Sequence, residues 1–396
     1  MISTGSVEGT NMADREPFML DIEKIVAGGE GLAFHEGRAV FVPFSLPGER
    51  VVVQLIEEKR DYAKAEIQEI LVSSPDRVVP ECPLFGICGG CNLQHASYSA
   101  QRIMKSVVVR DLFKRGAGFD PGELRIEAAE PYGYRNRVQF HFDRRGRLGF
   151  KRRGSGEVIA VPFCPIADPA VNAWLADHQA AARDELRPYV GNVDRFLVYG
   201  FGGKTWMEGR HHKVEIEVLG DKITFDPAGF FQSNLGMLGS LVESALDGID
   251  GGMAADLYAG VGLFGHFLAR RGARVVMVER EAKAMTEARG NVTGPIHRRY
   301  NLSVDEWCRG PGAESNFDFV VVDPPRSGLS AGLKAWMLRC RPPILSYVSC
   351  DPVTLARDAQ QLVEGGFRLA SLLLFDFYPQ TSHVEALARF VDASAE

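Results

Sequence analysis

Residues 255–265 read ADLYAGVGLFG, an apolar run that ends in a glycine-rich turn. Gly260, Gly262 and Gly265 have the G-x-G-x-x-G spacing of a strand that turns tightly into a helix, which here extends through Arg270. Apolar runs and helical patterns alternate from this point to the C-terminus. Such alternation is typical of a doubly wound parallel sheet, so the stretch predicts a Rossmann-like α/β domain.

The next apolar run, residues 275–278, ends at Glu279. A carboxylate at this place can hold the ribose hydroxyls of a nicotinamide dinucleotide or of S-adenosylmethionine. An oxidoreductase and a methyltransferase are therefore both compatible with this half of the domain. The second half favours S-adenosylmethionine, because Asp-Pro-Pro-Arg at 323–326 and a cysteine at a strand end occupy the edge that would hold a second mononucleotide unit.

Three further apolar runs each lead to a reactive side chain: residues 319–322 to Asp323, residues 345–349 to Cys350, and residues 372–375 toward Glu385. A strand end that opens into a loop suits a nucleophile, because the sheet fixes its position while the loop leaves it open to substrate. Cys350, followed at once by Asp-Pro, is thus a candidate nucleophile. The alternative is a buried thiol that packs as a small apolar side chain.

The composition is that of an ordinary globular protein, with 45% of the 396 residues hydrophobic and 24% charged, and the length allows two or three domains. No apolar run approaches the roughly 18 residues needed to cross a bilayer, and residues 1–16 lack the apolar core of a signal peptide. We therefore expect a cytoplasmic protein without a membrane partner. The net charge of −6 leaves only local basic patches for nucleic-acid contacts.

The N-terminal part has short strand-like runs separated by glycine and proline turns, at residues 18–25, 39–42, 50–56 and 64–71. This spacing predicts a small OB-like β-barrel, a fold that often binds oligonucleotides. A barrel that serves only as a scaffold fits the same pattern.

Three cysteines follow within ten residues, at Cys82, Cys88 and Cys91, and Cys164 lies further along the chain. Seven cysteines in a chain without a secretory signal argue against a disulfide framework. Zinc usually takes two compact Cys-x-x-Cys pairs, whereas three clustered cysteines and one remote ligand are closer to the spacing of an iron–sulfur site. The spacing therefore favours an iron–sulfur cluster over zinc.

A basic stretch lies between these ligands: residues 135–153 contain eight Lys or Arg and a single acid, Asp143, interleaved with aromatic side chains. Such a stretch can bind unpaired bases and phosphates of RNA, or it can be an ordinary solvated face. Upstream, residues 99–114 have the pattern of an amphipathic helix with Ile103, Val107 and Leu112 on or near one face.

The middle of the chain is predicted to be mainly β, with one helix near residues 170–187, and the boundary falls at Asp226-Pro227. A helix is expected to begin at residues 230–234 and to reach about residue 246. The predicted fold class is accordingly α/β and β multidomain. Its parts are a flexible tail at 1–16, the barrel at 17–75, a β-rich domain with the metal site at 76–225, and a Rossmann-like methyltransferase domain at 226–396.

Taken together, these motifs resemble the RNA uracil-5-methyltransferase family, in particular bacterial 23S ribosomal RNA members with an N-terminal TRAM domain and an iron–sulfur cluster. The resemblance covers residues 18–390. It implies that Cys350 is the nucleophile and Glu385 the general base. It implies cluster ligands at Cys82, Cys88, Cys91 and Cys164. It implies methyl-donor contacts from Gln232, Tyr258, Gly260, Gly262, Glu279, Asn301 and Asp323. Ala259 stands where many members have cysteine, which affects no catalytic role.

The chemistry implied by this resemblance is methylation of carbon 5 of a uridine by S-adenosylmethionine. Carbon 5 is too poor a nucleophile alone, so a thiolate first adds to carbon 6, and a base later removes the carbon 5 proton. The target base must leave its stack, so we expect single-stranded or loop RNA as substrate, most simply 23S rRNA, and a monomeric enzyme that also carries a 4Fe-4S cluster. The alternatives are a tRNA uracil-5-methyltransferase and a non-catalytic RNA-binding or assembly factor.

Overall fold

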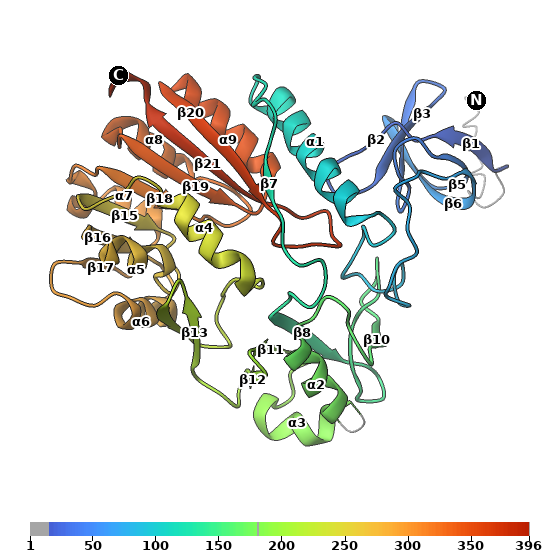
Figure 1. Cartoon of the computed structure of the whole chain (residues 1–396), viewed down its shortest axis with the longest axis horizontal. Coiled ribbons are helices and arrows are strands. Elements are labelled where there is room, and N and C mark those ends of the chain that lie inside the picture. The colour runs from blue at the N-terminus through green and yellow to red at the C-terminus, as the bar shows by residue number, and fades with distance from the viewer. Residues whose placement is uncertain (1–15, 180–181, 396) are drawn as a thin grey trace, which may run out of the picture. The chain divides into compact units, whose positions relative to one another are not determined.

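The computed structural model describes residues 16–179 and 182–395, which divide into two compact units (Figure 1). The first unit comprises the chain up to Met104 together with Gln380–Ser382, and the second comprises Lys105–Pro379 together with the chain from His383 onward. The tail predicted at 1–16 lies outside the described residues except for Glu16. Among the described helices, none is long and apolar enough to cross a membrane.

The first unit is built on a six-stranded sheet with the strand order β1-β5-β6-β4-β3-β2. β1 pairs with β5 and β2 pairs with β3, and only Ile22 and Glu23 separate β1 from β2, so one short run of chain joins both edges of the sheet. Val40, Val51 and Val53 lie in its core. The bounds are β1 (Phe18–Asp21), β2 (Lys24–Ile25), β3 (Gly31–His35), β4 (Arg38–Val42), β5 (Arg50–Glu58) and β6 (Tyr62–Val72).

The sequence does not predict β3, which begins at the last glycine of the 28–31 turn. β3 contains no β-branched residue, and its sequence, Gly-Leu-Ala-Phe-His, shows little strand propensity. Its pairing with β4 over five residues supplies the stability that local propensity lacks.

α1 (Tyr98–Gly116) matches the predicted helix, but the predicted apolar face is wrong. Ile103 and Val107 are 65% and 46% exposed, whereas Val109 and Phe113 are fully buried in the core of the second unit. The buried stripe also contains Lys105, so hydrophobic periodicity could not identify it. The boundary between the two units falls inside α1, after Met104.

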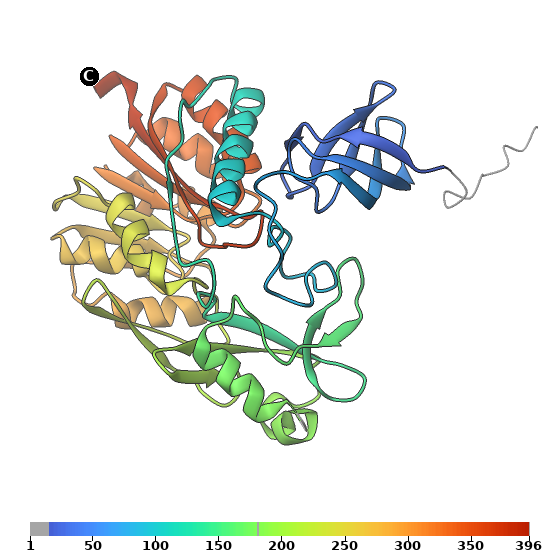
Figure 2. The same cartoon turned by 45° about the vertical axis from the view of Figure 1, so that its right-hand side comes forward.

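The second unit contains a five-stranded antiparallel sheet with the strand order β10-β9-β8-β11-β12, the green strands of Figure 2. Phe140 of β8 packs with Trp174 and Leu186 of two helices, which together cover one face of this sheet. These two helices replace the single helix predicted at 170–187. Their bounds and those of the strands are α2 (Pro169–His178), α3 (Ala182–Val190), β8 (Arg137–Phe142), β9 (Leu148–Lys151), β10 (Val158–Ala160), β11 (Arg195–Phe201) and β12 (Lys204–Met207).

The side chain of Gln179, the residue that follows α2, explains where this helix ends. Its Oε1 accepts a hydrogen bond from the Leu148 N–H at 3.1 Å, and its Nε2 donates to the carbonyls of Leu148 and Val161 at 3.2 and 3.0 Å. The side chain is thereby bound to the backbone of the sheet and anchors the end of the helix there.

The second unit also contains an eight-stranded sheet with the order β17-β16-β15-β18-β19-β21-β20-β7. Its first five strands are parallel, in the Rossmann order 3-2-1-4-5. β21 is antiparallel to both β19 and β20, so the sheet is mixed and not wholly parallel as predicted. The short connection from Phe375 to Glu385 explains this, since a parallel crossover needs a dozen or more residues.

The strands of this sheet have the following bounds: β7 (Ile126–Glu127), β15 (Met253–Leu257), β16 (Arg274–Val278), β17 (Arg298–Tyr300), β18 (Phe319–Val322), β19 (Ile344–Ser349), β20 (Phe367–Phe375) and β21 (Glu385–Asp392).

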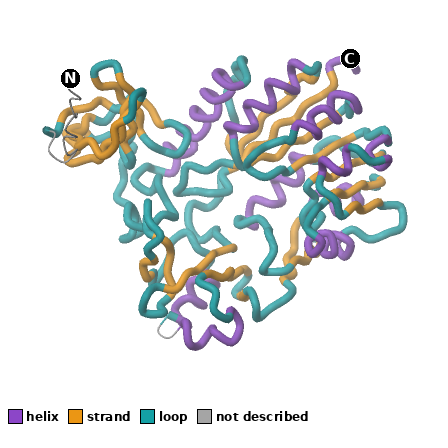
Figure 3. Tube along the Cα trace, turned by 180° about the vertical axis from the view of Figure 1, so that it is seen from behind, coloured by secondary structure: helices purple, strands orange, loops and turns teal. Residues whose placement is uncertain are grey.

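Helices pack on both faces of the eight-stranded sheet (Figure 3). Along β18, Val320 and Val322 face the core shared with α1, α7, α8 and α9, while Phe319 and Val321 face the core shared with α4, α5, α6 and the β13–β14 hairpin. These elements are α4 (Leu238–Ala245), α5 (Leu263–Arg270), α6 (Ala282–Asn291), α7 (Val304–Cys308), α8 (Ala331–Cys340), α9 (Pro352–Glu364), β13 (Val214–Val218) and β14 (Asp221–Phe225).

The helix predicted to open at residues 230–234 begins later than expected. The chain is irregular up to Asn234, makes a 3₁₀ turn at Leu235–Met237 and only then enters α4. Asn234 Nδ2 donates to the Phe377 carbonyl at 3.2 Å, and the Leu235 N–H donates to Asn136 Oδ1 at 2.9 Å. These contacts with distant loops replace the first helical hydrogen bonds.

The buried ion pair between Lys105 of α1 and Asp376 gives a stability prediction. The two side chains are 2% and 0% exposed, and their charged atoms are 2.6 Å apart. Lys105→Met leaves a carboxylate buried without its cation, so we expect a loss of ~3–5 kcal/mol in the free energy of unfolding, measured by urea denaturation. The double variant Lys105→Met/Asp376→Leu should recover most of this loss. Equal urea midpoints for the wild type and Lys105→Met would contradict the assignment.

Candidate active site

The strand ends predicted to carry reactive groups meet at one edge of the eight-stranded sheet, because paired parallel strands point the same way. β21 runs in the opposite direction, so its first residue, Glu385, lies at this same edge. The other residues that follow directly on strand ends here are Tyr258, Glu279, Asp323 and Cys350.

The pairing of β19 with β21 brings the candidate nucleophile and the candidate base together. In the register of these strands the last pair is Ser349 opposite Ala386, and the next residues at this end are Cys350 and Glu385. The two side chains lie close enough for the Glu385 carboxyl to raise the pKa of the Cys350 thiol. A thiol and a carboxyl that are distant in sequence are therefore neighbours at the sheet edge.

The surroundings of Cys350 oppose ionisation of its thiol. Burial, and after it the nearby carboxyls of Glu385 and Asp323, raise the pKa of the half-buried Cys350 to about 11. Arg326 acts against them, through its positive charge and a hydrogen bond to the thiol. The sequence analysis did not single out Arg326 as a site residue, although it completes the Asp-Pro-Pro-Arg motif.

Glu385 is almost completely buried, at 2% exposure. Burial raises its pKa well above the ordinary value, the neighbouring Asp323 adds to this shift, and Arg326 again opposes it. The proton on Glu385 is therefore held more tightly than on a surface glutamate. A carboxyl with a raised pKa is a stronger base when ionised than a surface glutamate, which suits a role in removing a proton.

The glycine-rich turn after β15 has the backbone that its sequence predicts. Tyr258, Gly260 and Gly262 all have positive φ, at 63°, 54° and 81°. A Cβ added at Gly262 would lie 3.1 Å from Ala288 Cβ, so a side chain would crowd α6. Glu279 supports the turn, because its Oε2 accepts from the Gly260 N–H at 3.1 Å and its Oε1 accepts from the Glu281 N–H at 2.7 Å.

Two more carboxyls line the same edge. Asp256 is 1% exposed and accepts a hydrogen bond from the Gly265 N–H at 2.8 Å, and burial raises its pKa to about 7. Asp323 keeps some contact with solvent, but the atoms around its carboxyl also raise its pKa, and Gln232 Nε2 lies 3.4 Å from its Oδ2. Asp256 is not among the site residues predicted from the sequence, because it lies inside the strand before the glycine turn and not at the strand end.

Asn301 lies beside the ribose-binding position predicted for Glu279. Its Nδ2 donates to the carbonyls of Glu279 and Arg280, both at 2.9 Å. Its amide thus fixes the backbone just after β16. With carboxyls at 256, 279, 323 and 385, the sheet edge attracts a cationic ligand, since a positive charge nearby stabilises each carboxylate.

The predicted cluster ligands are divided between the units. Cys82, Cys88 and Cys91 lie in the first unit and Cys164 in the second, and all four are half-buried. The Gly90 N–H donates to Cys88 Sγ at 3.4 Å, and the Cys164 N–H donates to Asn172 Oδ1 at 2.9 Å. Within residues 16–179 and 182–395, no group of three or more His, Cys, Asp or Glu side chains is arranged to hold a metal ion.

A Rossmann-like sheet with an inserted antiparallel strand and an acid-lined edge places the chain among α/β proteins with additional β domains. Comparison with known proteins narrows this class. The TRAM domain model matches residues 19–68, and the model described as tRNA (Uracil-5-)-methyltransferase matches residues 313–389. A protein of Pyrococcus abyssi, tRNA (uracil-54, C5)-methyltransferase solved with S-adenosyl-L-homocysteine, has the same fold, with a TM-score of 0.72 over 94% of this chain and 100% of that one at 23% identity.

Two relatives match nearly the whole chain. An uncharacterized RNA methyltransferase of Treponema denticola is 31% identical over 93% of this chain and 97% of its own. The 23S rRNA (uracil(1939)-C(5))-methyltransferase RlmD of Edwardsiella ictaluri is 31% identical over 98% of each chain. The chain belongs to the RNA uracil-5-methyltransferase family, as its sequence motifs predicted.

The high pKa of Cys350 can be tested by alkylation of the ligand-free protein with iodoacetamide. Because the thiolate is the reactive form, the rate at Cys350 should still rise about tenfold per pH unit between about pH 7 and about pH 9.5. A cysteine in a short unstructured peptide, with a pKa near 8.5, serves as the control and should level off within this range. Mass spectrometry of the Cys350 peptide gives the rate. A plateau at Cys350 below about pH 9 would show that the free site already stabilises the thiolate.

Proposed function

We propose that this protein transfers the methyl group of S-adenosylmethionine to carbon 5 of a uridine in 23S rRNA, in the cytoplasm. The observation that carries the proposal is the position of Cys350 and Glu385, which lie next to the paired Ser349 and Ala386 of β19 and β21 at the edge where the nucleotide turn also ends. Covalent methylation of uracil needs a nucleophile and a general base that both reach the same uracil ring. Cys350 and Glu385 are close enough to act on one ring.

In the proposed reaction the Cys350 thiolate adds to carbon 6, and the electron pair of the carbon 5–carbon 6 double bond moves toward the carbon 4 oxygen. Carbon 5 then attacks the donor methyl group, and the donor leaves as neutral S-adenosylhomocysteine. Ionised Glu385 accepts the carbon 5 proton. The electrons of that C–H bond re-form the double bond and expel the Cys350 thiolate, so every atom and electron pair is accounted for.

The electrostatics of the free site require a change before the first step. A thiol with a pKa of about 11 is ionised in roughly one molecule in 10⁴ at neutral pH. We infer that the sulfonium of the bound donor offsets the carboxyls of Asp323 and Glu385, and that Arg326 then stabilises the thiolate through its hydrogen bond. Ordered binding, with the donor before the RNA, follows from this inference.

The proposed donor contacts have separate tasks. Glu279 would accept hydrogen bonds from the ribose hydroxyls, with its carboxylate already oriented by the Gly260 and Glu281 N–H groups. Asn301 supports the backbone beside it. Gln232 and Asp323, whose side chains lie 3.4 Å apart, would contact the donor near the reacting centre. Tyr258, Gly260 and Gly262 complete the proposed set.

The RNA class is proposed from two facts. Relatives that match the full length are named for uracil-5-methylation of 23S rRNA, and the N-terminal TRAM domain is compatible with an RNA substrate of either class. A tRNA substrate is the second candidate, because the family model and the solved relative carry tRNA names. Both RNAs therefore belong in the substrate test.

We also propose that Cys82, Cys88, Cys91 and Cys164 hold a 4Fe-4S cluster. Four thiols are the usual ligand set of such a cluster, and the Gly90 N–H already donates to Cys88 Sγ, the type of hydrogen bond that tunes cluster sulfurs. When bound, the cluster would cross-link the segments that carry its ligands. None of the proposed catalytic steps uses it.

The catalytic roles are tested with a 23S rRNA fragment and a tRNA, each carrying 5-fluorouridine at candidate positions. Fluorine cannot leave as a proton, so the wild type should methylate the base and stop as a covalent protein–RNA adduct on denaturing gels. Cys350→Ser should give no adduct, because a hydroxyl is a far weaker nucleophile at neutral pH. Cys340→Ser, which changes a half-buried cysteine of α8, is the matched control and should react like the wild type.

Glu385→Gln separates methyl transfer from proton removal. It should add to ordinary uridine RNA and methylate it, yet accumulate the adduct and lose roughly 10²–10⁴-fold in turnover, the usual contribution of a positioned base. If Glu385→Gln turns over normally, the base lies elsewhere. If Cys350→Ser still forms the adduct, the nucleophile is wrongly assigned.

The cluster is tested by purification without oxygen. The protein should be brown and contain iron and acid-labile sulfide, and Cys88→Ser should lose both, because one of the four thiolates is removed. A single zinc ion without iron in the wild type would exclude the cluster. Cys308→Ser, a change at a buried cysteine outside the proposed ligand set, should leave the iron content unchanged.

A further inference from the structure

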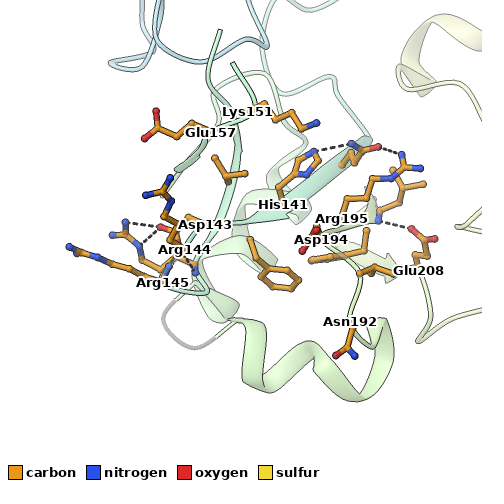
Figure 4. Close-up of a pocket in the computed structure, with 18 of the residues that line it drawn as sticks. His141, Asp143, Arg144, Arg145, Lys151, Glu157, Asn192, Asp194, Arg195 and Glu208 are labelled. Atoms are coloured by element: carbon orange, nitrogen blue, oxygen red, sulfur yellow. Dashed lines mark hydrogen bonds and ion pairs between the residues drawn. The ribbon is translucent and has the colours of Figure 1, made fainter. Parts of the chain in front are cut away.

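A groove of about 1430 Å³ lies on the five-stranded sheet of the second unit (Figure 4). Gln139 and His141 of β8 and Arg195 of β11 line it, whereas the alternate residues of β8 pack against α2 and α3. The groove therefore occupies the sheet face that these two helices leave open. Arg195 lies outside the basic stretch that the sequence analysis identified.

The floor of the groove is a directed chain of hydrogen bonds. Arg195 Nη1 donates to Gln139 Oε1 at 3.0 Å, and Gln139 Nε2 lies 3.0 Å from His141 Nε2. His141 is 8% exposed, and burial together with the nearby Lys151 lowers its pKa. Because Gln139 Oε1 accepts from Arg195, the Gln139 amide nitrogen faces the ring, and His141 Nε2 is assigned as its acceptor. The orientation of Gln139 is thus fixed, with its second amide hydrogen and the remaining Arg195 donors available to a ligand.

Six Lys or Arg and four Asp or Glu line the groove, so its lining is basic overall. Two of the acids, Glu157 and Asp194, pair with Arg152 at 2.8 Å and with Arg183 at 3.8 Å. Asp143 is occupied by Arg147, through an ion pair of 2.8 Å, and by the Arg145 N–H. Glu208 accepts from the Leu197 N–H at 2.9 Å. Within the part of the chain that the structure describes, the guanidinium groups of Arg144 and Arg145 have no ion-pair partner, and both line the groove.

One end of the groove reaches the segment that leads to the candidate active site. Arg137 and Ala228 line this end, and Arg137 Nη2 donates to the Gly229 carbonyl at 3.4 Å. Arg137 Nε is buried and has no hydrogen-bond partner among the described residues. Gln232, a proposed donor contact, follows a few residues later in the same segment.

We propose that this groove binds a single-stranded stretch of the substrate RNA that flanks the target uridine. The inference rests on the proposed function and adds the place where the flanking nucleotides lie. Donors on the floor and cations on the wall match an acceptor-rich polyanion, and a strand without a paired partner can present both phosphates and base edges to them. Arg144 and Arg145 contact phosphate, and Gln139 with Arg195 contacts a base or ribose oxygen.

The test measures binding of the full-length protein to a 23S rRNA fragment containing the methylated uridine, at several salt concentrations. Arg144→Ala/Arg145→Ala should lower the magnitude of the salt slope by about 0.7 for each phosphate contact removed. Arg195→Ala and Gln139→Leu should weaken binding as well, because both break the floor chain. Arg187→Ala, an exposed residue of α3 on the covered side of the sheet, is the matched control and should bind like the wild type.

Donor binding and thermal melting, measured on every variant, identify any that are misfolded. A variant with a lowered melting point is replaced by the uncharged Arg→Gln or by the Gln139→Asn substitution at the same position. The proposal is overturned if folded groove variants bind RNA like the wild type, or if Arg187→Ala weakens binding equally, which would indicate diffuse charge. Failure of the proposed function looks different: the wild type would then methylate no RNA, whatever its groove variants bind.

Discussion

The antiparallel insertion of β21 between β19 and β20 is the constraint on which the site depends. Without it, the first residue of the last strand would lie at the opposite edge of the sheet, away from Cys350. The register that places Ser349 opposite Ala386 brings a thiol and a buried carboxyl close together. The glycine turn and the ends of β16 and β18 reach the same edge, so the proposed donor site, nucleophile and base share one place by strand geometry alone.

Bringing these groups together has an electrostatic cost, because buried carboxyls lie beside one another and beside the thiol. A cationic methyl donor can offset this cost. The carboxyls at positions 256, 323 and 385 all have raised pKa values because the edge is poorly solvated, and two of them raise the pKa of Cys350 as well. Arg326 is the cation that opposes these shifts at both Cys350 and Glu385. In the proposed mechanism a cationic methyl donor completes the balance, and the thiol of the free enzyme would stay protonated until the donor binds.

The strand ends that carry Asp323 and Cys350 could be predicted from sequence, because apolar runs that stop at polar residues are local signals. The neighbour relation of Cys350 and Glu385 could not, since it depends on the direction and register of β21. Arg326 was overlooked because its role appears only where its guanidinium reaches the thiol. The apolar face assigned to α1 was wrong because the buried stripe includes Lys105, whose charge is satisfied by the distant Asp376.

The central claim is that this chain methylates carbon 5 of uridine in 23S rRNA. The most direct test maps 5-methyluridine by mass spectrometry in ribosomal and transfer RNA from a strain that lacks the gene. We predict that at least one 5-methyluridine disappears from 23S rRNA, that the wild-type gene restores it, and that a Cys350→Ser gene does not. An unchanged 23S rRNA, with or without a loss in tRNA, would contradict the account.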